Sequence, residues 1–296
     1  HEEDPFSDQC LVLHICLLVE LNMKTDLYSL ASSLVEARPD SVISWFCVGC
    51  YYYAIANYEK AGKFFSKATN MDMRFVPAWI AYGHTFSNVE ESDQAMAAYR
   101  NAIRLQPGSH LGQLFMGMEH IHSGNLLLAF DFITKSQHIC PFDPLVYNEL
   151  GVIAYKMKRY GEALKYFQQA MRYSPSTVDS NEHWEFPIFN YANTLRKLKR
   201  YSEALEYYSK ALSQLPNQSS TYSAMGFTHH LMGHFQEAIE YYHRALGFKS
   251  NDTFSLQMLD KALQEVCQLP SPGLVGSPPS GPRGQLPVPS LFLPRD

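Results

Sequence analysis

Small residues recur along the chain at a fixed interval. The interval is 34 residues, lengthened once to 41, and it separates Ala61, Ala95, Ala129, Ala163, Ala204 and Ala238. The same series, with the same long interval, separates Gly49, Gly83, Gly117, Gly151, Ala192 and Gly226. Two series that share one insertion predict an array of structural repeats rather than separate domains.

Each period predicts two helices. Trp45, Gly49 and Tyr52 follow one another at spacings of four and three in the first half of a period, and Ala163 and Phe167 are four apart in the second half. These spacings place the residues on one face of a helix. We expect Gly and Ala to mark the points where two helices approach closely, with the rings filling the space around them.

The period also predicts the organisation of the whole chain. Seven repeats plus a capping helix, which runs from about Thr253 to Leu263, are expected over residues 8–263, with a short insertion at about 178–184. Residues 1–7 are expected to form a flexible start. Residues 264–296 are expected to form a disordered Pro/Gly-rich tail, because such a composition buries too little apolar surface to order itself.

Composition narrows the classes of partner. The chain is 46% hydrophobic and only 18% charged, below the roughly 25% of a typical soluble domain. A net charge of −5 argues against nucleic acid or an anionic membrane as a partner. The longest apolar run, Leu11 to Leu21, is too short to span a bilayer. Six cysteines make no disulfide scaffold, so a reducing compartment is expected.

No motif for catalysis, for a cofactor or for a metal stands out. Cys47 and Cys50 form one CxxC pair without a second pair at ligand spacing. We interpret both as small helix-face residues, with a metal or redox site as the alternative. Two basic runs, at 156–159 and 196–200, are interpreted as solvated turns, with an acidic docking patch as the alternative. We therefore predict no enzyme, no cofactor and no metal.

The spacing of small and aromatic residues resembles the tetratricopeptide repeat, over about residues 8 to 263. The resemblance implies an all-α fold, a right-handed superhelix of helix pairs (α-solenoid), whose first helices line a concave groove. The groove positions predict these partner-binding residues: Phe46, Cys50, Tyr53, Ile80, His84, Leu114, Met118, Leu145, Asn148, Val152, Tyr155, Phe186, Phe189, Asn193, Arg196 and Phe227. A helix that is apolar on all sides must be covered on all sides.

Two interpretations of this groove remain open. In the first, a partner segment packs against the apolar residues, and Asn148 and Asn193 hydrogen-bond its backbone. In the second, the residues pack only against neighbouring first helices. A carboxylate-clamp chaperone adaptor is disfavoured because the fifth position of each repeat carries no basic residue.

Two runs carry a closer resemblance. The sequences from Trp45 to Tyr52 (WFCVGCYY) and from Pro77 to Phe86 (PAWIAYGHTF) resemble the tetratricopeptide subunits of the anaphase-promoting complex. That resemblance implies a non-catalytic scaffold of a cell-cycle ubiquitin ligase, whose groove encloses an extended segment of a small disordered accessory subunit. It also implies contact with other tetratricopeptide subunits and a nuclear and cytoplasmic, spindle-associated location.

Two further expectations accompany the resemblance. A homodimer is expected only of a longer protein, because family members dimerise through repeats that this chain lacks. The alternative function is a peptide-binding adaptor or a targeting-sequence receptor of another complex.

Overall fold

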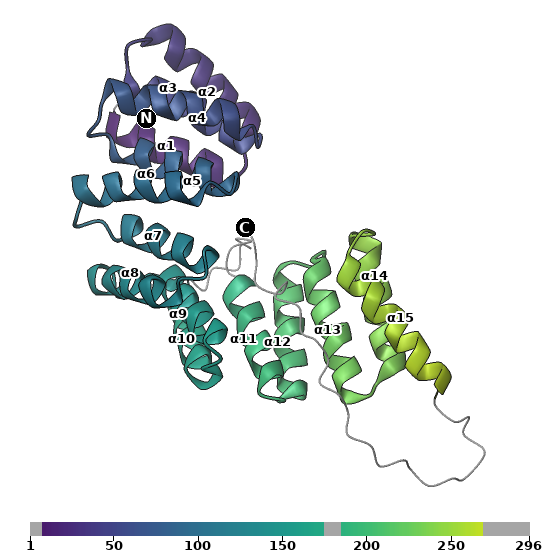
Figure 1. Cartoon of the computed structure of the whole chain (residues 1–296). Coiled ribbons are helices and arrows are strands. Elements are labelled where there is room, and N and C mark those ends of the chain that lie inside the picture. Colours follow the sequence, from purple (N-terminus) through teal and green to yellow (C-terminus); the bar gives the residue numbers. More distant parts are fainter. Residues whose placement is uncertain (1–7, 175–184, 269–296) are drawn as a thin grey trace, which may run out of the picture. The chain divides into compact units, whose positions relative to one another are not determined.

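The structure, a computed structural model, describes residues 8–174 and 185–268. Within these ranges the chain forms fifteen α-helices and no strand, which confirms the predicted all-α fold (Figure 1). The helices are α1 (Asp8–Glu20), α2 (Lys24–Ala37), α3 (Val42–Ala54), α4 (Tyr58–Met71), α5 (Val76–Asn88), α6 (Ser92–Leu105), α7 (His110–His122), α8 (Leu126–Ile139), α9 (Pro144–Lys156), α10 (Tyr160–Tyr173), α11 (Glu185–Lys197), α12 (Tyr201–Gln214), α13 (Ser219–Met232), α14 (Phe235–Phe248) and α15 (Thr253–Gln268). The expected flexible start and the expected insertion lie outside the described residues.

The helices divide into two compact units. Unit 1, residues 1–141, contains α1 to α8, and unit 2, residues 142–296, contains α9 to α15. Each unit has apolar clusters of its own: Phe46 lies in one cluster of unit 1, while Tyr208 and Tyr242 lie in two clusters of unit 2. The packing of each unit is therefore described from its own helix pairs.

In five pairs, those that begin with α3, α5, α7, α9 and α13, the first helix approaches the second so closely that a glycine leaves no room for a side chain at one point. A Cβ atom added to Gly83 would lie 2.3 Å from the ring of Tyr99, and one added to Gly151 would lie 2.5 Å from the ring of Phe167. Both rings are almost completely buried. Only a hydrogen atom fits opposite them, so the recurring small residue is a packing requirement.

The turn inside each pair ends the first helix in the same way. One residue per turn has a positive φ, between 53° and 83°. These residues are Asn22, Ala56, Glu90, Gly124, Lys158, Lys199 and Gly233. In the second pair, the amide of Ala56 donates to the Tyr53 carbonyl and the amide of Asn57 donates to the Tyr52 carbonyl. A left-handed residue with these two bonds ends a helix. A positive-φ residue therefore recurs in each repeat, as the small residues do.

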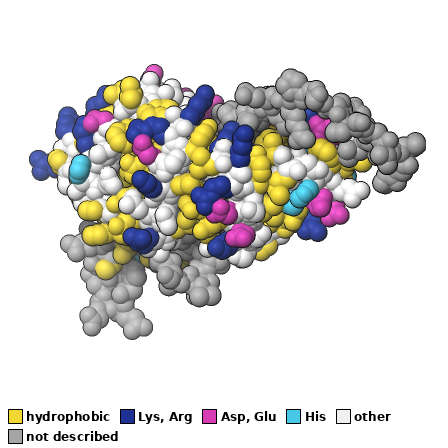
Figure 2. Space-filling model, turned by 90° about the horizontal axis from the view of Figure 1, so that it is seen from below, with side chains coloured by type: hydrophobic (Ala, Val, Ile, Leu, Met, Phe, Trp, Pro, Cys, Tyr) yellow, Lys and Arg dark blue, Asp and Glu magenta, His cyan; other side chains and the backbone are white. Residues whose placement is uncertain are grey.

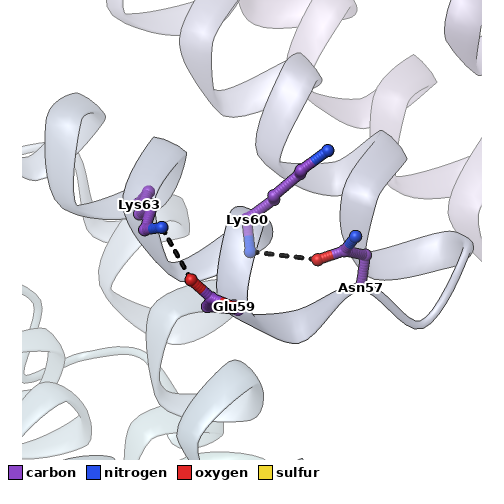
Figure 3. Close-up of polar contacts among 4 residues, drawn as sticks. All are labelled: Asn57, Glu59, Lys60 and Lys63. Atoms are coloured by element: carbon purple, nitrogen blue, oxygen red, sulfur yellow. Dashed lines mark hydrogen bonds and ion pairs between the residues drawn. The ribbon is translucent and has the colours of Figure 1, made fainter.

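Side-chain capping helps to start α4. Asn57 Oδ1 accepts a hydrogen bond from the backbone amide of Lys60 at 3.2 Å, and Lys63 Nζ lies 2.7 Å from Glu59 Oε1 (Figure 3). The cap satisfies an amide that has no partner inside the helix. The ion pair is solvent-exposed and contributes little to stability.

The capping helix is longer than predicted. We expected it to end at Leu263, with a tail from residue 264, but α15 continues to Gln268. Its buried face comprises Phe254, Met258 and Ala262, and the half-buried Val266 continues the same spacing by one turn. Residues 264–268 are therefore helical, because their apolar periodicity and the absence of proline before residue 270 extend the helix. The rest of the expected tail lies outside the described residues.

The second helix α8 departs from its counterparts in its first turn. The second helices α2, α4, α6, α10, α12 and α14 carry an acidic residue there, which favours the positive end of the helix dipole. Helix α8 has none and instead exposes Leu127 by 82% and Leu128 by 51%. Its start lacks a stabilising charge and presents apolar surface to solvent.

Replacing Gly151 by Ala is expected to destabilise the protein by about 1–3 kcal/mol, because the new methyl group overpacks against the buried Phe167 ring. Gly161→Ala in the same helix pair is the control. No atom lies within 4 Å of its added Cβ, so the change is expected to stabilise by up to about 1 kcal/mol through helix propensity. Urea unfolding measures both, and equal effects of the two substitutions would contradict the packing argument.

Replacing Leu128 by Glu is expected to stabilise the protein by about 0.3–1 kcal/mol, because it restores an acidic residue to the start of α8. Thermal unfolding at low ionic strength measures the change, and added salt should reduce it. Leu128→Lys removes the same apolar surface with the opposite charge. A Lys variant as stable as the Glu variant would rule out the dipole effect.

Candidate functional site

The predicted partner-binding residues of unit 1 all lie on its first helices. We define the unit 1 face as the set of Phe46, Cys50, Tyr53, Ile80, His84, Leu114 and Met118, carried by α3, α5 and α7. Phe46, Cys50 and Leu114 are buried, and the other four are partly exposed. The buried members belong to the core, so the partly exposed members are the ones that a partner can touch.

The unit 1 face is tied together by contacts between helices. Asn88 Nδ2 donates a hydrogen bond to the Tyr53 hydroxyl at 2.9 Å and so connects α5 to α3. His84 Nδ1 lies 2.9 Å from the hydroxyl of Tyr99, and its ring meets Phe115 edge-on at 4.3 Å. Burial lowers the pKa of His84 to about 4. The imidazole is therefore neutral at physiological pH, and this face carries no charge among its seven members.

The predicted residues of unit 2 also lie on first helices. We define the unit 2 face as the set of Leu145, Asn148, Val152, Tyr155, Phe186, Phe189, Asn193, Arg196 and Phe227, carried by α9, α11 and α13. Leu145 is 37% exposed, and Tyr155 and Phe186 are partly exposed. The remaining six are buried, including the charged Arg196.

The Arg196 guanidinium contacts a tyrosine hydroxyl, an asparagine side chain and a phenylalanine ring in the unit 2 face. Its Nε donates to the Tyr208 hydroxyl and its Nη2 donates to Asn193 Oδ1, both at 3.2 Å. The Tyr208 hydroxyl donates in turn to Asn193 Oδ1 at 2.7 Å, and the guanidinium lies 5.0 Å from the centre of the Phe227 ring. The sequence placed Arg196 in a basic run on a solvated turn as well as in the groove. The structure shows that it is 3% exposed and not part of the turn surface.

Two further residues of the unit 2 face were missed by the sequence analysis. Asn190 Nδ2 donates to Asn148 Oδ1 at 3.1 Å, and Asn148 Nδ2 donates to Glu149 Oε1 at 2.9 Å. Asn190 and Glu149 each stand one position after a predicted groove residue, at a position that the sequence analysis assigned to no role. A polar side chain directly after a groove position was the available signal.

Glu149 has an unusual acidity for a carboxyl group. Burial raises its pKa from 4.5 to about 7, although the hydrogen bond from Asn148 and the charge of Lys156 act in the opposite direction. Glu149 therefore changes charge near neutral pH, inside a hydrogen-bonded row of side chains.

A third polar group fastens the capping helix in unit 2. The Ser223 hydroxyl donates to Asp252 Oδ2 at 3.0 Å, and Ser255 bonds both residues. His230 Nε2 lies 3.0 Å from Glu265 Oε2 on α15. Burial lowers the pKa of His230, while Glu265 opposes that effect. These side chains connect α13 to the end of the array and are engaged within the protein.

An open cleft of about 560 Å³ lies in unit 1, away from the predicted residues. Its lining includes Tyr82 and Phe86 from α5 and the paired Glu59 and Lys63 from α4 (Figure 3). Those two charges neutralise each other, and none of the predicted partner-binding residues lines the cleft. A ligand site needs several polar groups directed at one point, which this lining does not provide.

The other chemistry considered from the sequence fits structural roles. Cys47 and Cys50 are buried, and burial raises the pKa of the Cys47 thiol to about 12, which opposes formation of the thiolate that metals and redox partners require. Residues 8–174 and 185–268 contain no cluster of three or more metal-ligating side chains.

Lys and Arg are interspersed with Asp and Glu on the face seen in Figure 2. No helix in the described part of the chain is long and apolar enough to cross a membrane.

Two sequence models of the tetratricopeptide repeat match the chain. One matches residues 143–213 and 184–250, and the other matches residues 76–109. The chain belongs to the tetratricopeptide-repeat family. This confirms the fold predicted from the period, and because the family's repeats form non-catalytic scaffolds, it also confirms the prediction that the chain is not an enzyme.

Several curated relatives of this tetratricopeptide chain are subunits of one complex. It is 46% identical over 267 residues to anaphase-promoting complex subunit 6 of Arabidopsis thaliana, covering 90% of this chain and 49% of that protein. It is 43% identical over 269 residues to the cell division cycle protein 16 homolog of Homo sapiens, covering 89% of this chain and 43% of that protein. The chain thus spans about half the length of these relatives or less.

A solved structure agrees with the sequence relatives. The crystal structure of the APC/C hetero-tetramer Cut9–Hcn1 contains a chain with 33% identity and a TM-score of 0.82, covering 88% of this chain and 50% of that chain. PilF of Pseudomonas aeruginosa shares the fold at 17% identity and a TM-score of 0.61. These similarities confirm the resemblance to the anaphase-promoting complex subunits, while the partner-binding residues stay a prediction.

Replacing Glu149 by Gln is expected to stabilise the protein at pH 8 by about 1–3 kcal/mol, because Gln keeps an acceptor for Asn148 without a buried charge. The pKa of Glu149 is higher in the folded chain than in the unfolded one, so the folded wild type binds this proton more tightly. The stability that the folded wild type gains from binding this proton is therefore fully present below pH 4.5. It is lost as the pH rises to about 7.

Urea unfolding of wild type and Glu149→Gln between pH 4.5 and 8 measures this difference. The gap should be largest at pH 8 and should close as the pH falls, because both side chains are then uncharged. Glu206→Gln, at an exposed position in the middle of α12, is the control and should show no gap that grows with pH. A constant gap for Glu149→Gln would show that its carboxyl group titrates normally.

Proposed function

We propose that this chain is a non-enzymatic scaffold segment of the anaphase-promoting complex, a cell-cycle ubiquitin ligase, and that it encloses an extended segment of a small accessory subunit. The scaffold role is supported by relatives that are subunits of this complex in a plant and in a mammal. The accessory subunit is supported by the related hetero-tetramer, in which Cut9 occurs together with Hcn1.

The observation that carries this proposal is the composition of the unit 2 face. Tyr155 and Phe186 offer partly exposed rings, and buried amides and Arg196 lie among them. The two partly exposed rings can pack against apolar side chains of an extended segment. The buried amides and Arg196 are engaged within the protein and hold the face in shape.

The unit 1 face supports the apolar part of the same function. Tyr53, Ile80, His84 and Met118 are partly exposed and uncharged, since burial keeps the His84 imidazole neutral at physiological pH. Such a surface suits apolar side chains of a partner and disfavours a charged one, because a charge would lose its hydration there. The methionine adds an adaptable contact.

The proposal includes the wider setting that the resemblance implies. Other tetratricopeptide subunits are proposed as partners, in line with the weaker similarity to anaphase-promoting complex subunit 3 of Schizosaccharomyces pombe, 24% identical over 155 residues. The location proposed is nuclear and cytoplasmic, with spindle association in mitosis. No homodimer is expected of this chain.

Titration of the purified chain with fluorescent 20-residue peptides tiled along the small accessory subunit tests the function. We expect one extended segment to bind, and we expect Tyr155→Ala and Phe186→Ala each to weaken it at least tenfold, because buried aromatic contacts dominate such interfaces. Fluorescence anisotropy measures the affinity, and circular dichroism establishes that each variant is folded.

Tyr166→Ala, on the second helix α10, is the matched control, because it removes a partly exposed ring outside the unit 2 face. It should leave the affinity unchanged. If Tyr155→Ala and Phe186→Ala both bind the peptide as tightly as wild type, the segment does not bind to the unit 2 face. Binding of none of the peptides would refute the enclosed segment and leave only the scaffold role.

A further inference from the structure

The open cleft in unit 1 lies where one repeat lacks a large side chain. Counted with the period of the chain, the position of Gly62 in α4 holds a large apolar or aromatic residue in each of the other six second helices. These residues are Tyr28, Met96, Phe130, Leu164, Leu205 and Ile239. Gly62 is the exception, and it is one of the residues that line the cleft of about 560 Å³.

The side chain at this position joins one repeat to the next. The ring of Tyr28 lies 5.2 Å from the ring of Tyr51, which is on the first helix of the following pair. Leu164 packs against the apolar cluster that contains Phe189, again on the first helix of the following pair. In these repeats the second helix therefore covers the next first helix with a side chain of its own.

Gly62 faces the next first helix in the same way but leaves the space open. A Cβ atom added to Gly62 would lie 3.6 Å from Thr85 Cγ2 and 3.8 Å from Tyr82 Cε2, both on α5. These are ordinary van der Waals distances, so a large side chain has room there. The rings of Tyr58, Tyr82 and Phe86 line the space. The cleft does not suit a small polar ligand, but it has the form of a socket for an apolar side chain.

We propose that this cleft is a docking site for an amphipathic helix of another protein, which inserts a large apolar side chain beside Gly62. The chemistry of that side chain follows from the residues that fill the corresponding space in other repeats, such as Met96 and Leu164. The cleft shares no residue with the unit 1 face or the unit 2 face. The inference therefore goes beyond the proposed function and does not depend on it.

The length of the cleft favours a helix with two apolar anchors. The lining along α4 runs from Tyr58 to Ser66, which is about two turns or about 12 Å at a rise of about 1.5 Å per residue. A helix that lies in a groove of this length contacts it with side chains four residues apart.

The charge of the cleft favours a basic residue beside the anchors. The charged residues of the lining are Glu59, Lys63 and Glu91. Glu59 and Lys63 pair with each other at 2.7 Å (Figure 3), so Glu91 leaves the lining with a net negative charge. A lysine or arginine of the incoming helix complements Glu91 and helps to set the orientation of that helix.

Binding of one synthetic helix tests the proposal. The probe is a fluorescent alanine-based peptide, held helical by a hydrocarbon staple, with two leucines four residues apart and a lysine one turn beyond them. We expect it to bind wild type with a Kd below about 100 µM, and to bind Gly62→Leu at least tenfold more weakly because the new side chain occupies the space. Fluorescence anisotropy measures both affinities. No binding to wild type at about 1 mM peptide would overturn the docking site.

Gly62→Leu is expected to unfold at a higher temperature than Gly62→Ala, since both gain helix propensity but only leucine packs against α5. A loss of binding then does not reflect unfolding, and a leucine variant less stable than the alanine variant would show that the space is not open. Gly161→Leu in α10 is the matched control, because no atom lies within 4 Å of its added Cβ. It should bind the probe as wild type does. Equal binding to wild type and Gly62→Leu would overturn the assignment to this cleft.

Changes in the peptide test each part of the proposed helix. Replacing both leucines by serine should weaken binding at least tenfold, and equal binding would exclude the apolar insertion. A proline in the middle of an unstapled version prevents the helix, so equal affinities of the unstapled peptides with and without proline would show that the occupant is extended.

A double-mutant cycle tests the charge. Replacing the peptide's lysine by glutamine should weaken binding to wild type about threefold and leave the affinity for Glu91→Gln unchanged. The Glu91 side chain makes no capping hydrogen bond to α6, so Glu91→Gln removes the charge without removing a cap. Added salt should reduce the coupling. Independent effects of the two changes would overturn the pairing of Glu91 with a basic residue.

Discussion

The close approach of two helices at one small residue is the contact on which the rest of the structure depends. Where Gly83 faces Tyr99 and Gly151 faces Phe167, no side chain larger than hydrogen fits the first helix. The ring opposite fills the space and fixes the two helices in register. Because a glycine makes this contact in α3, α5, α7, α9 and α13, one side of each of these first helices packs against its second helix, and the opposite side is left for other contacts.

The opposite side is not uniform. On the unit 1 face the partly exposed groups are apolar or neutral, whereas the unit 2 face combines rings with amides, a carboxyl group near its midpoint of titration and a buried guanidinium. Buried polar groups lower stability unless they are paired, so most of them are joined in short rows. One row ends in the Oδ1 atom of Asn190, which has no hydrogen-bond partner.

Much of the fold could be predicted from residues, and part of the site could not. The placement of the predicted partner-binding residues on first helices followed from their register, and the all-α fold followed from the period. Asn190 and Glu149 were missed because each stands next to a groove position, and only the structure shows that both bond to Asn148. Asn148 and Asn193 were expected to face a partner, yet both are engaged inside the protein. The end of α15 was placed at Leu263, although the apolar spacing of Met258, Ala262 and Val266 continues for one more turn.

The sequence by itself determined the period, the helix pairs and the family, because close packing of small residues against rings leaves a spacing that can be counted along one chain. Only the tertiary structure decided which polar side chains pair and which oxygen is left over. Asn190 and Asn148 are 42 residues apart, and the hydrogen bond between them depends on the distance between two helices and on the direction of each amide. Neither quantity is encoded in spacing, so the unpaired acceptor emerges only when the first helices lie side by side.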